Sequence, residues 1–104
     1  IPLAKILVVD DEVHVCAIVK LMLEKDGHKV VTVNNGKDAL KEITTLHPDL
    51  IVLDVMMPEM DGYSVCGKLS ENPETRSIPV IVFTIHDKMK ELFSVASNVV
   101  AFLI

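Results

Sequence analysis

Five short apolar segments recur along the chain, and helical patterns separate them. The segments are Ala4–Val9, Lys29–Val33, Asp49–Leu53, Ile78–Phe83 and Val99–Ile104. Segments of this length that are apolar throughout, rather than alternating, are typical of strands buried on both faces of a parallel sheet. The sequence therefore predicts one α/β domain in which right-handed crossovers place helices on both faces of a single sheet.

Apolar residues at helical spacing predict four helices between these strands. The expected inner faces are Val15, Ile18, Val19 and Met22; Ala39, Leu40 and Ile43; Val65, Cys66 and Leu69; and Met89, Leu92, Phe93 and Ala96. Gly27 is expected to end the first helix, and His47-Pro48 the second.

Composition narrows the classes of partner. The 104 residues carry a formal net charge of -5 and contain no run of Lys or Arg, which disfavours binding to nucleic acid or to an anionic membrane surface. No apolar segment approaches the ~18 residues of a membrane span. Cys16 and Cys66 lack the spacing of a metal site, so we expect free thiols in a reducing cytoplasm.

Polar residues follow three of the predicted strands at the point where each strand ends. Asp10 and Asp11 follow the first, Asp54 the third and Thr84 the fourth. Ligands of open α/β sheets bind at these carboxyl ends, so neighbouring strands would bring the residues into one pocket. Two carboxylates ~5 Å apart repel by roughly 3 kcal/mol at an effective dielectric constant of ~20. A cluster of three therefore favours a cation, and oxygen ligands favour Mg²⁺.

Simpler roles for the same residues stay open. Asp10 or Asp11 can cap the following helix, and Asp54 can be an ordinary loop carboxylate. If the carboxylates do meet around Mg²⁺, one of them can act as a nucleophile in phosphoryl transfer, with the Thr84 hydroxyl donating to a phosphoryl oxygen. The chain has no Walker loop and no GxGxxG, so nucleotide binding is disfavoured.

Three motifs resemble the receiver domain of two-component response regulators. They are KILVVDDE (Lys5–Glu12), PDLIVLDVMMPEMDG (Pro48–Gly62) and PVIVFT (Pro79–Thr84). The resemblance implies a flavodoxin-like (βα)5 three-layer sandwich with a parallel sheet in the order 2-1-3-4-5. It also implies a single receiver domain over residues 1–104, truncated near the end of strand five and apparently lacking the last helix.

The resemblance also implies roles for single residues. Asp54 is expected to accept a phosphoryl group from a sensor histidine kinase or phosphotransfer protein. Mg²⁺ would be held by Asp10, Asp11, Asp54 and the main-chain carbonyl of Met56. Thr84 would be the second catalytic residue. The domain would then be a phosphoacceptor switch rather than an enzyme, assisting only its own phosphorylation and dephosphorylation.

The conformational switch is expected to involve Thr84 and Phe102. The family carries a Lys-Pro after the fifth strand, and this chain ends at Ile104 before that point, so we expect its phosphorylation to be impaired. Without the last helix one face of the sheet would be bare, so we expect the chain to be less stable or to bury that face in a dimer or a swapped arrangement. One alternative is a non-phosphorylated interaction module. Another is a Mg²⁺-dependent phosphatase, which would need an acidic residue where Met56 stands.

Overall fold

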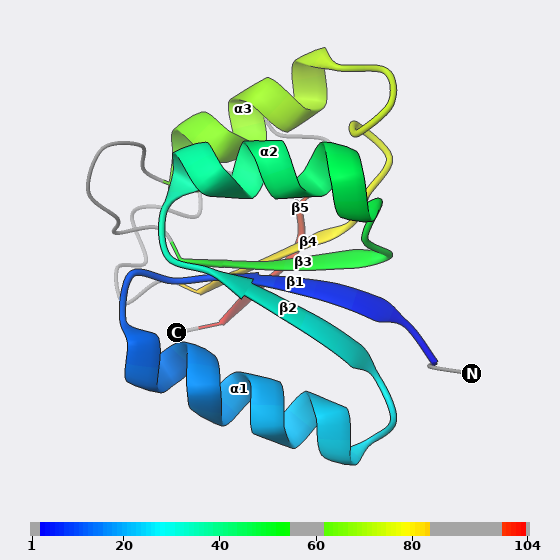
Figure 1. Ribbon diagram of the computed structural model, residues 1–104. Helices are drawn as coiled ribbons and strands as arrows, with labels where there is room; N and C mark the ends of the chain where they lie inside the picture. Colours follow the sequence, from blue (N-terminus) through cyan, green and yellow to red (C-terminus); the bar gives the residue numbers. More distant parts are fainter. Residues whose placement is uncertain (1–2, 55–61, 84–98, 104) are drawn as a thin grey trace.

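The computed structural model describes residues 3–54, 62–83 and 99–103 (Figure 1). A parallel five-stranded sheet has the order β2-β1-β3-β4-β5. The strands are β1 (Lys5–Val9), β2 (Lys29–Val33), β3 (Leu50–Asp54), β4 (Val80–Phe83) and β5 (Val99–Leu103). The described helices are α1 (Val13–Lys25), α2 (Gly36–Leu46) and α3 (Gly62–Glu71). The predicted flavodoxin-like fold and its strand order are confirmed. The predicted fourth helix lies outside the described residues.

The sheet is the middle layer of the molecule. Helices α2 and α3 lie on one face and α1 on the other (Figure 1). Successive strand side chains point to opposite faces, so Leu7 and Val9 contact the α2 and α3 side while Ile6 and Val8 contact the α1 side. All four are at most 2% exposed. Burial on both faces explains why the strands are apolar throughout.

Two cores follow from this arrangement. The α2–α3 core consists of Leu7, Val9, Ala39, Ile43, Ile51, Leu53, Val65, Cys66, Leu69, Val80 and Val82. The α1 core consists of Ile6, Val8, Cys16, Val30 and Val52, with Ala4, Val19, Leu23 and Leu50 packed against it. The inner faces predicted for α2 and α3 are therefore confirmed.

The ends of α2 have local causes. The Asn35 side chain accepts a hydrogen bond from the Asp38 N–H at 2.7 Å and so caps the first turn. At the other end His47 adopts a left-handed conformation (φ 50°), and its N–H donates to the Ile43 carbonyl at 3.0 Å. The predicted stop at His47-Pro48 is confirmed. After α1, Gly27 turns the chain into β2 with a φ of 96°.

The inner face of α1 differs from the prediction. The expected stripe included Ile18 and Met22, which are 60% and 64% exposed. Val19 packs against the α1 core as predicted, but together with Cys16 and Leu23, which the stripe did not include. The prediction was wrong for Ile18 and Met22 because apolar residues occur around most of this helix, so their spacing does not single out one face. Within the described ranges, no helix has the length and apolarity needed to cross a membrane.

Candidate functional site

Three carboxylates meet at the carboxyl ends of β1 and β3. These strands are paired in parallel with Val9 opposite Leu53, so Asp10 and Asp54 leave the sheet at the same edge. One carboxylate oxygen from each of Asp10, Asp11 and Asp54 lies within 4.8 Å of the other two. The structure thus brings together the three aspartates that the strand-end pattern singled out.

The three carboxylates differ in how the fold holds them. Asp54 is the last residue of β3 and is paired with Phe83 of β4, whereas the sequence pattern placed it just after the strand. Its main chain is therefore fixed by the sheet. Asp10 is only 8% exposed, and Asp11 is exposed on the turn that leads into α1. The site combines one buried, one half-buried and one exposed acidic group.

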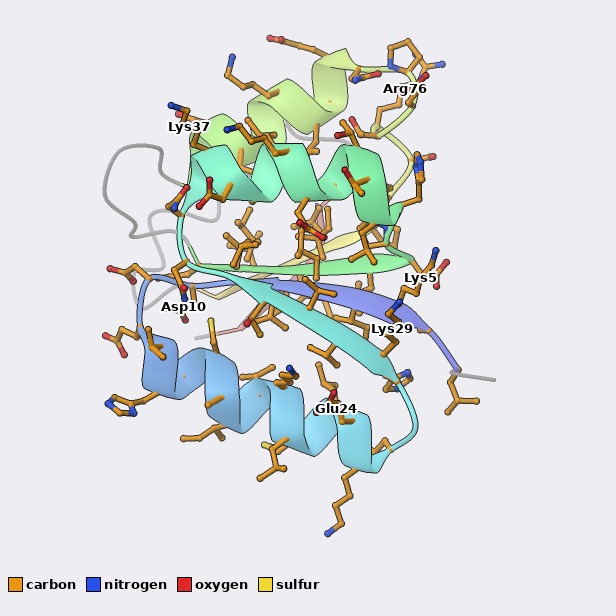
Figure 2. All side chains as sticks on the ribbon, viewed as in Figure 1. Lys5, Asp10, Glu24, Lys29, Lys37 and Arg76 are labelled. Atoms are coloured by element: carbon orange, nitrogen blue, oxygen red, sulfur yellow. The ribbon has the colours of Figure 1, made fainter. Side chains whose placement is uncertain are left out.

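Asp10 lies at the end of β1 (Figure 2), and its hydrogen bonds organise the turn between β1 and α1. Its Oδ1 accepts a hydrogen bond from the Glu12 N–H at 2.9 Å. Its own N–H donates to the Val33 carbonyl at 3.1 Å. The N-cap residue of α1 is Glu12, which forms no side-chain cap. The sequence left open that Asp10 or Asp11 caps the helix. In the structure the Asp10 side chain instead bonds to the N–H of Glu12, the residue that precedes the first residue of α1.

The electrostatics of the cluster favour a bound cation. Burial raises the pKa of the Asp10 carboxyl; the hydrogen bond from the Glu12 N–H lowers it, and the charges of Asp11 and Glu12 raise it further. A second and third carboxylate within 4.8 Å add repulsion, about 3 kcal/mol per ionised pair at an effective dielectric constant near 20. A set of carboxylate oxygens is also the ligand chemistry that Mg²⁺ prefers. The residues present therefore fit a hard divalent ion.

Three other predicted site residues are Met56, Thr84 and Phe102. Met56 and Thr84 lie outside the described residues. Phe102 belongs to β5, where its main chain pairs with Val82 of β4. The roles expected for these three residues stay predictions.

Two residues without a predicted role contact the site. Asn34 follows β2, and its Nδ2 donates to the Asp10 carbonyl at 3.1 Å. The thiol of Cys16 donates to the same carbonyl at 3.4 Å. Asn34 could have been predicted from the sequence, because it is the first polar residue after β2, a strand next to β1. For Cys16 no sequence signal distinguished a contact with Asp10 from apolar packing.

Comparison with known proteins identifies the family. Residues 6–101 match the family described as the response regulator receiver domain. The alkaline phosphatase synthesis transcriptional regulatory protein PhoP of Bacillus subtilis (strain 168) is 43% identical over 84 residues, which cover 81% of this chain and 34% of PhoP. The chain therefore spans about a third of the length of this relative.

Solved structures show the same fold. The N-terminal domain of a response regulator receiver protein from Methanoculleus marisnigri JR1 is 31% identical with a TM-score of 0.88, and the match covers 97% of this chain and 83% of that one. The response regulator TrrA from Thermotoga maritima, solved in complex with Mg²⁺-BeF, is 28% identical with a TM-score of 0.84, covering 96% and 84%. The chain belongs to the response regulator receiver domain family, the phosphoacceptor signalling domains of two-component systems.

Proposed function

We propose that Asp54 is the residue that accepts the phosphoryl group, and that Mg²⁺ held by Asp10, Asp11 and Asp54 is required for the transfer. The observation that carries this proposal is the approach of the three carboxylates to within 4.8 Å at the carboxyl edge of the sheet. The structural relative TrrA was solved with Mg²⁺-BeF, which supports the choice of ion. The Met56 carbonyl is proposed as a further ligand on the family resemblance.

The phosphoryl donor is a phosphohistidine of a sensor histidine kinase or phosphotransfer protein. A carboxylate oxygen of Asp54 attacks the phosphorus atom, so an O–P bond forms as the P–N bond to the imidazole breaks. The electron pair of that bond stays on the imidazole nitrogen, which then takes up a proton. Bound Mg²⁺ supplies positive charge against the phosphoryl oxygens. Asp54 suits this role because its place at the end of β3 holds its main chain still during the attack.

Phosphorylation then acts as a conformational switch. The phosphoryl group attracts the Thr84 hydroxyl, and Phe102 changes position with it, which shifts a two-state equilibrium. The pairing of Phe102 with Val82, two residues before Thr84, supports a connection between the two positions. The domain thus works as a signalling switch and catalyses only changes in its own phosphorylation.

We place the domain in the cytoplasm, which is supported by two buried free cysteines. We also propose that two copies associate, which is supported by the exposed large apolar side chains of α1. These are Val13, Ile18, Leu21 and Met22.

Phosphorylation is tested by intact-mass measurement after incubation with Mg²⁺ and phosphoramidate. We expect one added phosphoryl group on the protein and none on Asp54→Asn. Asp49→Asn is the matched control, because Asp49 precedes β3 at its opposite end and accepts a hydrogen bond from the Lys5 N–H. The phosphoacceptor proposal is wrong if the wild-type protein gains no mass, or if Asp54→Asn gains as much as the wild type.

Mg²⁺ binding is tested by thermal unfolding. Neutralising the clustered charge should raise the melting temperature, and Mg²⁺ at ten times its Kd should add about 1.4 kcal/mol to the free energy of unfolding. Asp11→Asn should abolish the increase. Asp26→Asn, an exposed change at the far end of α1, should retain it. A melting temperature that does not respond to millimolar Mg²⁺ would count against the metal site.

A further inference from the structure

The main-chain carbonyl of Asp10 is held by donors from two different elements. Asn34 Nδ2 donates to it at 3.1 Å from the segment after β2, and Cys16 Sγ donates at 3.4 Å from the first turn of α1. Asn34 Nδ2 also lies 3.8 Å from Cys16 Sγ. The Cys16 thiol has a second, longer contact with the Val33 carbonyl at 4.0 Å. We call the Asp10 carbonyl, the Cys16 thiol and the Asn34 amide the Asp10 clamp.

Among the described residues, the clamp provides the Asp10 carbonyl with hydrogen-bond donors that the sheet does not. Strand β1 ends at Val9, so the Asp10 carbonyl lies beyond the last residue of the strand, in a residue that is only 8% exposed. A carbonyl oxygen has two lone pairs and is costly to bury without a donor. Asn34 and Cys16 supply one donor each. The Asp10 N–H donates to the Val33 carbonyl, so the main chain of this residue is fixed on both sides.

This carbonyl belongs to the peptide unit that joins Asp10 to Asp11. Because the peptide unit is planar, fixing its oxygen fixes the direction in which the chain continues to the Asp11 Cα. The Asp10 carboxylate is oriented separately by its hydrogen bond from Glu12. The Asp11 side chain is exposed. The clamp therefore acts on Asp11 through its main chain, by fixing the peptide unit that precedes it.

We propose that Cys16 and Asn34 are positioning residues for the Mg²⁺ site. They hold the Asp10–Asp11 peptide unit so that both carboxylates face Asp54 before the ion arrives, which lowers the reorganisation needed for binding. Neither residue touches the ion, and the thiol acts in its neutral form as a donor. This inference rests on the proposed Mg²⁺ site and adds to it the groups that shape it.

The two cysteines make the proposal testable against simple packing. Both thiols are buried and free. Cys16 contacts the Asp10 carbonyl, whereas Cys66 belongs to the α2–α3 core. Removing either sulfur leaves a small cavity, and only Cys16→Ala also removes a donor from the clamp. Asn34 is exposed, so Asn34→Ala removes the other donor without changing core volume.

The experiment measures Mg²⁺ affinity by isothermal titration calorimetry and, separately, the free energy of unfolding without Mg²⁺. Cys16→Ala and Asn34→Ala should each raise the Kd for Mg²⁺ by roughly tenfold, the lower end of outer-shell effects on metal affinity. Cys16→Ser keeps a donor and should recover most of the affinity. Cys66→Ala should lower stability and leave the Kd unchanged. The phosphorylation rate of Cys16→Ala should approach that of the wild type at saturating Mg²⁺.

The outcomes separate the two proposals. If the wild-type protein binds no Mg²⁺, the metal site and the clamp are both wrong. If the wild type binds Mg²⁺ and Asp11→Asn does not, but Cys16→Ala and Asn34→Ala match the wild-type Kd, only the clamp is wrong. Should Cys16→Ala fail to fold, Asn34→Ala and Cys16→Ser decide the question, since Asn34 lies outside the core. An increase in Kd that Cys16→Ser does not reverse would assign Cys16 to packing alone.

Discussion

The two faces of the sheet differ in how the sequence marks the helices that cover them. On one face, α2 and α3 turn well-defined apolar stripes inward, and their core includes Ile51 and Leu53, both 0% exposed. On the other face, α1 contacts the sheet through Cys16, Val19 and Leu23 while large apolar side chains remain exposed on its outer side. The inner face of an amphipathic helix can be predicted from its sequence, whereas the inner face of a helix that is apolar on most sides cannot.

The strands do not share this difference. Ile6, Val8 and Val52 face α1 and are at most 6% exposed, close to the values on the opposite face. The contrast therefore lies in the helices and not in the sheet. It leads to three tests, ordered by the size of the expected effect.

The largest effect is expected from paired substitutions of aliphatic residues. Ile51→Ala leaves a cavity in the α2–α3 core and should lower the free energy of unfolding by about 2–5 kcal/mol. Leu21→Ala on the outer side of α1, where Leu21 is 71% exposed in the single chain, should cost less than about 0.5 kcal/mol at a protein concentration low enough to keep the chain monomeric. Urea unfolding with an unchanged m-value measures both. A similar cost for the two variants in the monomer would show that the outer side of α1 is packed within the chain itself, and the comparison of faces would fail.

The second test uses alkaline pH. Burial raises the pKa of the Cys66 thiol from 9.0 to about 12. Because the folded state keeps the proton more tightly than the unfolded state, the stability from this group is complete below pH 9.0 and is lost as pH rises toward 12. The expected slope in that window is about 1.4 kcal/mol per pH unit.

Cys66→Ala should remove that slope while lowering stability at neutral pH. The measurement is the difference in unfolding free energy between the wild type and this variant as pH rises, so that titration of other groups cancels. A difference that stays constant above pH 9.0 would mean that the α2–α3 core does not exclude water from Cys66. The α2–α3 core would then not be the tightly packed one of the two, and the comparison of the faces would fail.

The smallest effect is expected from Met22→Lys, since Met22 is 64% exposed. Stability should change by less than about 0.5 kcal/mol. If two copies associate through the outer side of α1, the charge should weaken that association, and sedimentation velocity over a range of concentrations should show more monomer. Lys25 is already basic and exposed on the same helix, so Lys25→Arg serves as the control. Self-association that is equal in Met22→Lys and the wild type would rule out this surface.

Much of the fold could be predicted because its signals are local. Continuous apolar strands indicated burial on both faces, and His47-Pro48 ended α2 where the structure ends it. The strand order came from the family resemblance, since periodicity alone does not tell which strands are neighbours. The inner face of α1 was predicted correctly for Val19 and wrongly for Ile18 and Met22, because several sides of this helix are apolar.

The candidate site could likewise be predicted from the sequence only in part. The acidic residues at the strand ends can be read from the sequence, and Asp10, Asp11 and Asp54 meet because β1 and β3 are parallel neighbours. That Asp54 ends its strand, and that residues 16 and 34 hold the carbonyl of residue 10, became visible only in the folded chain. The groups involved lie far apart along the chain. Periodicity reports contacts within one element, whereas the Asp10 clamp joins three segments that come together only when the sheet forms.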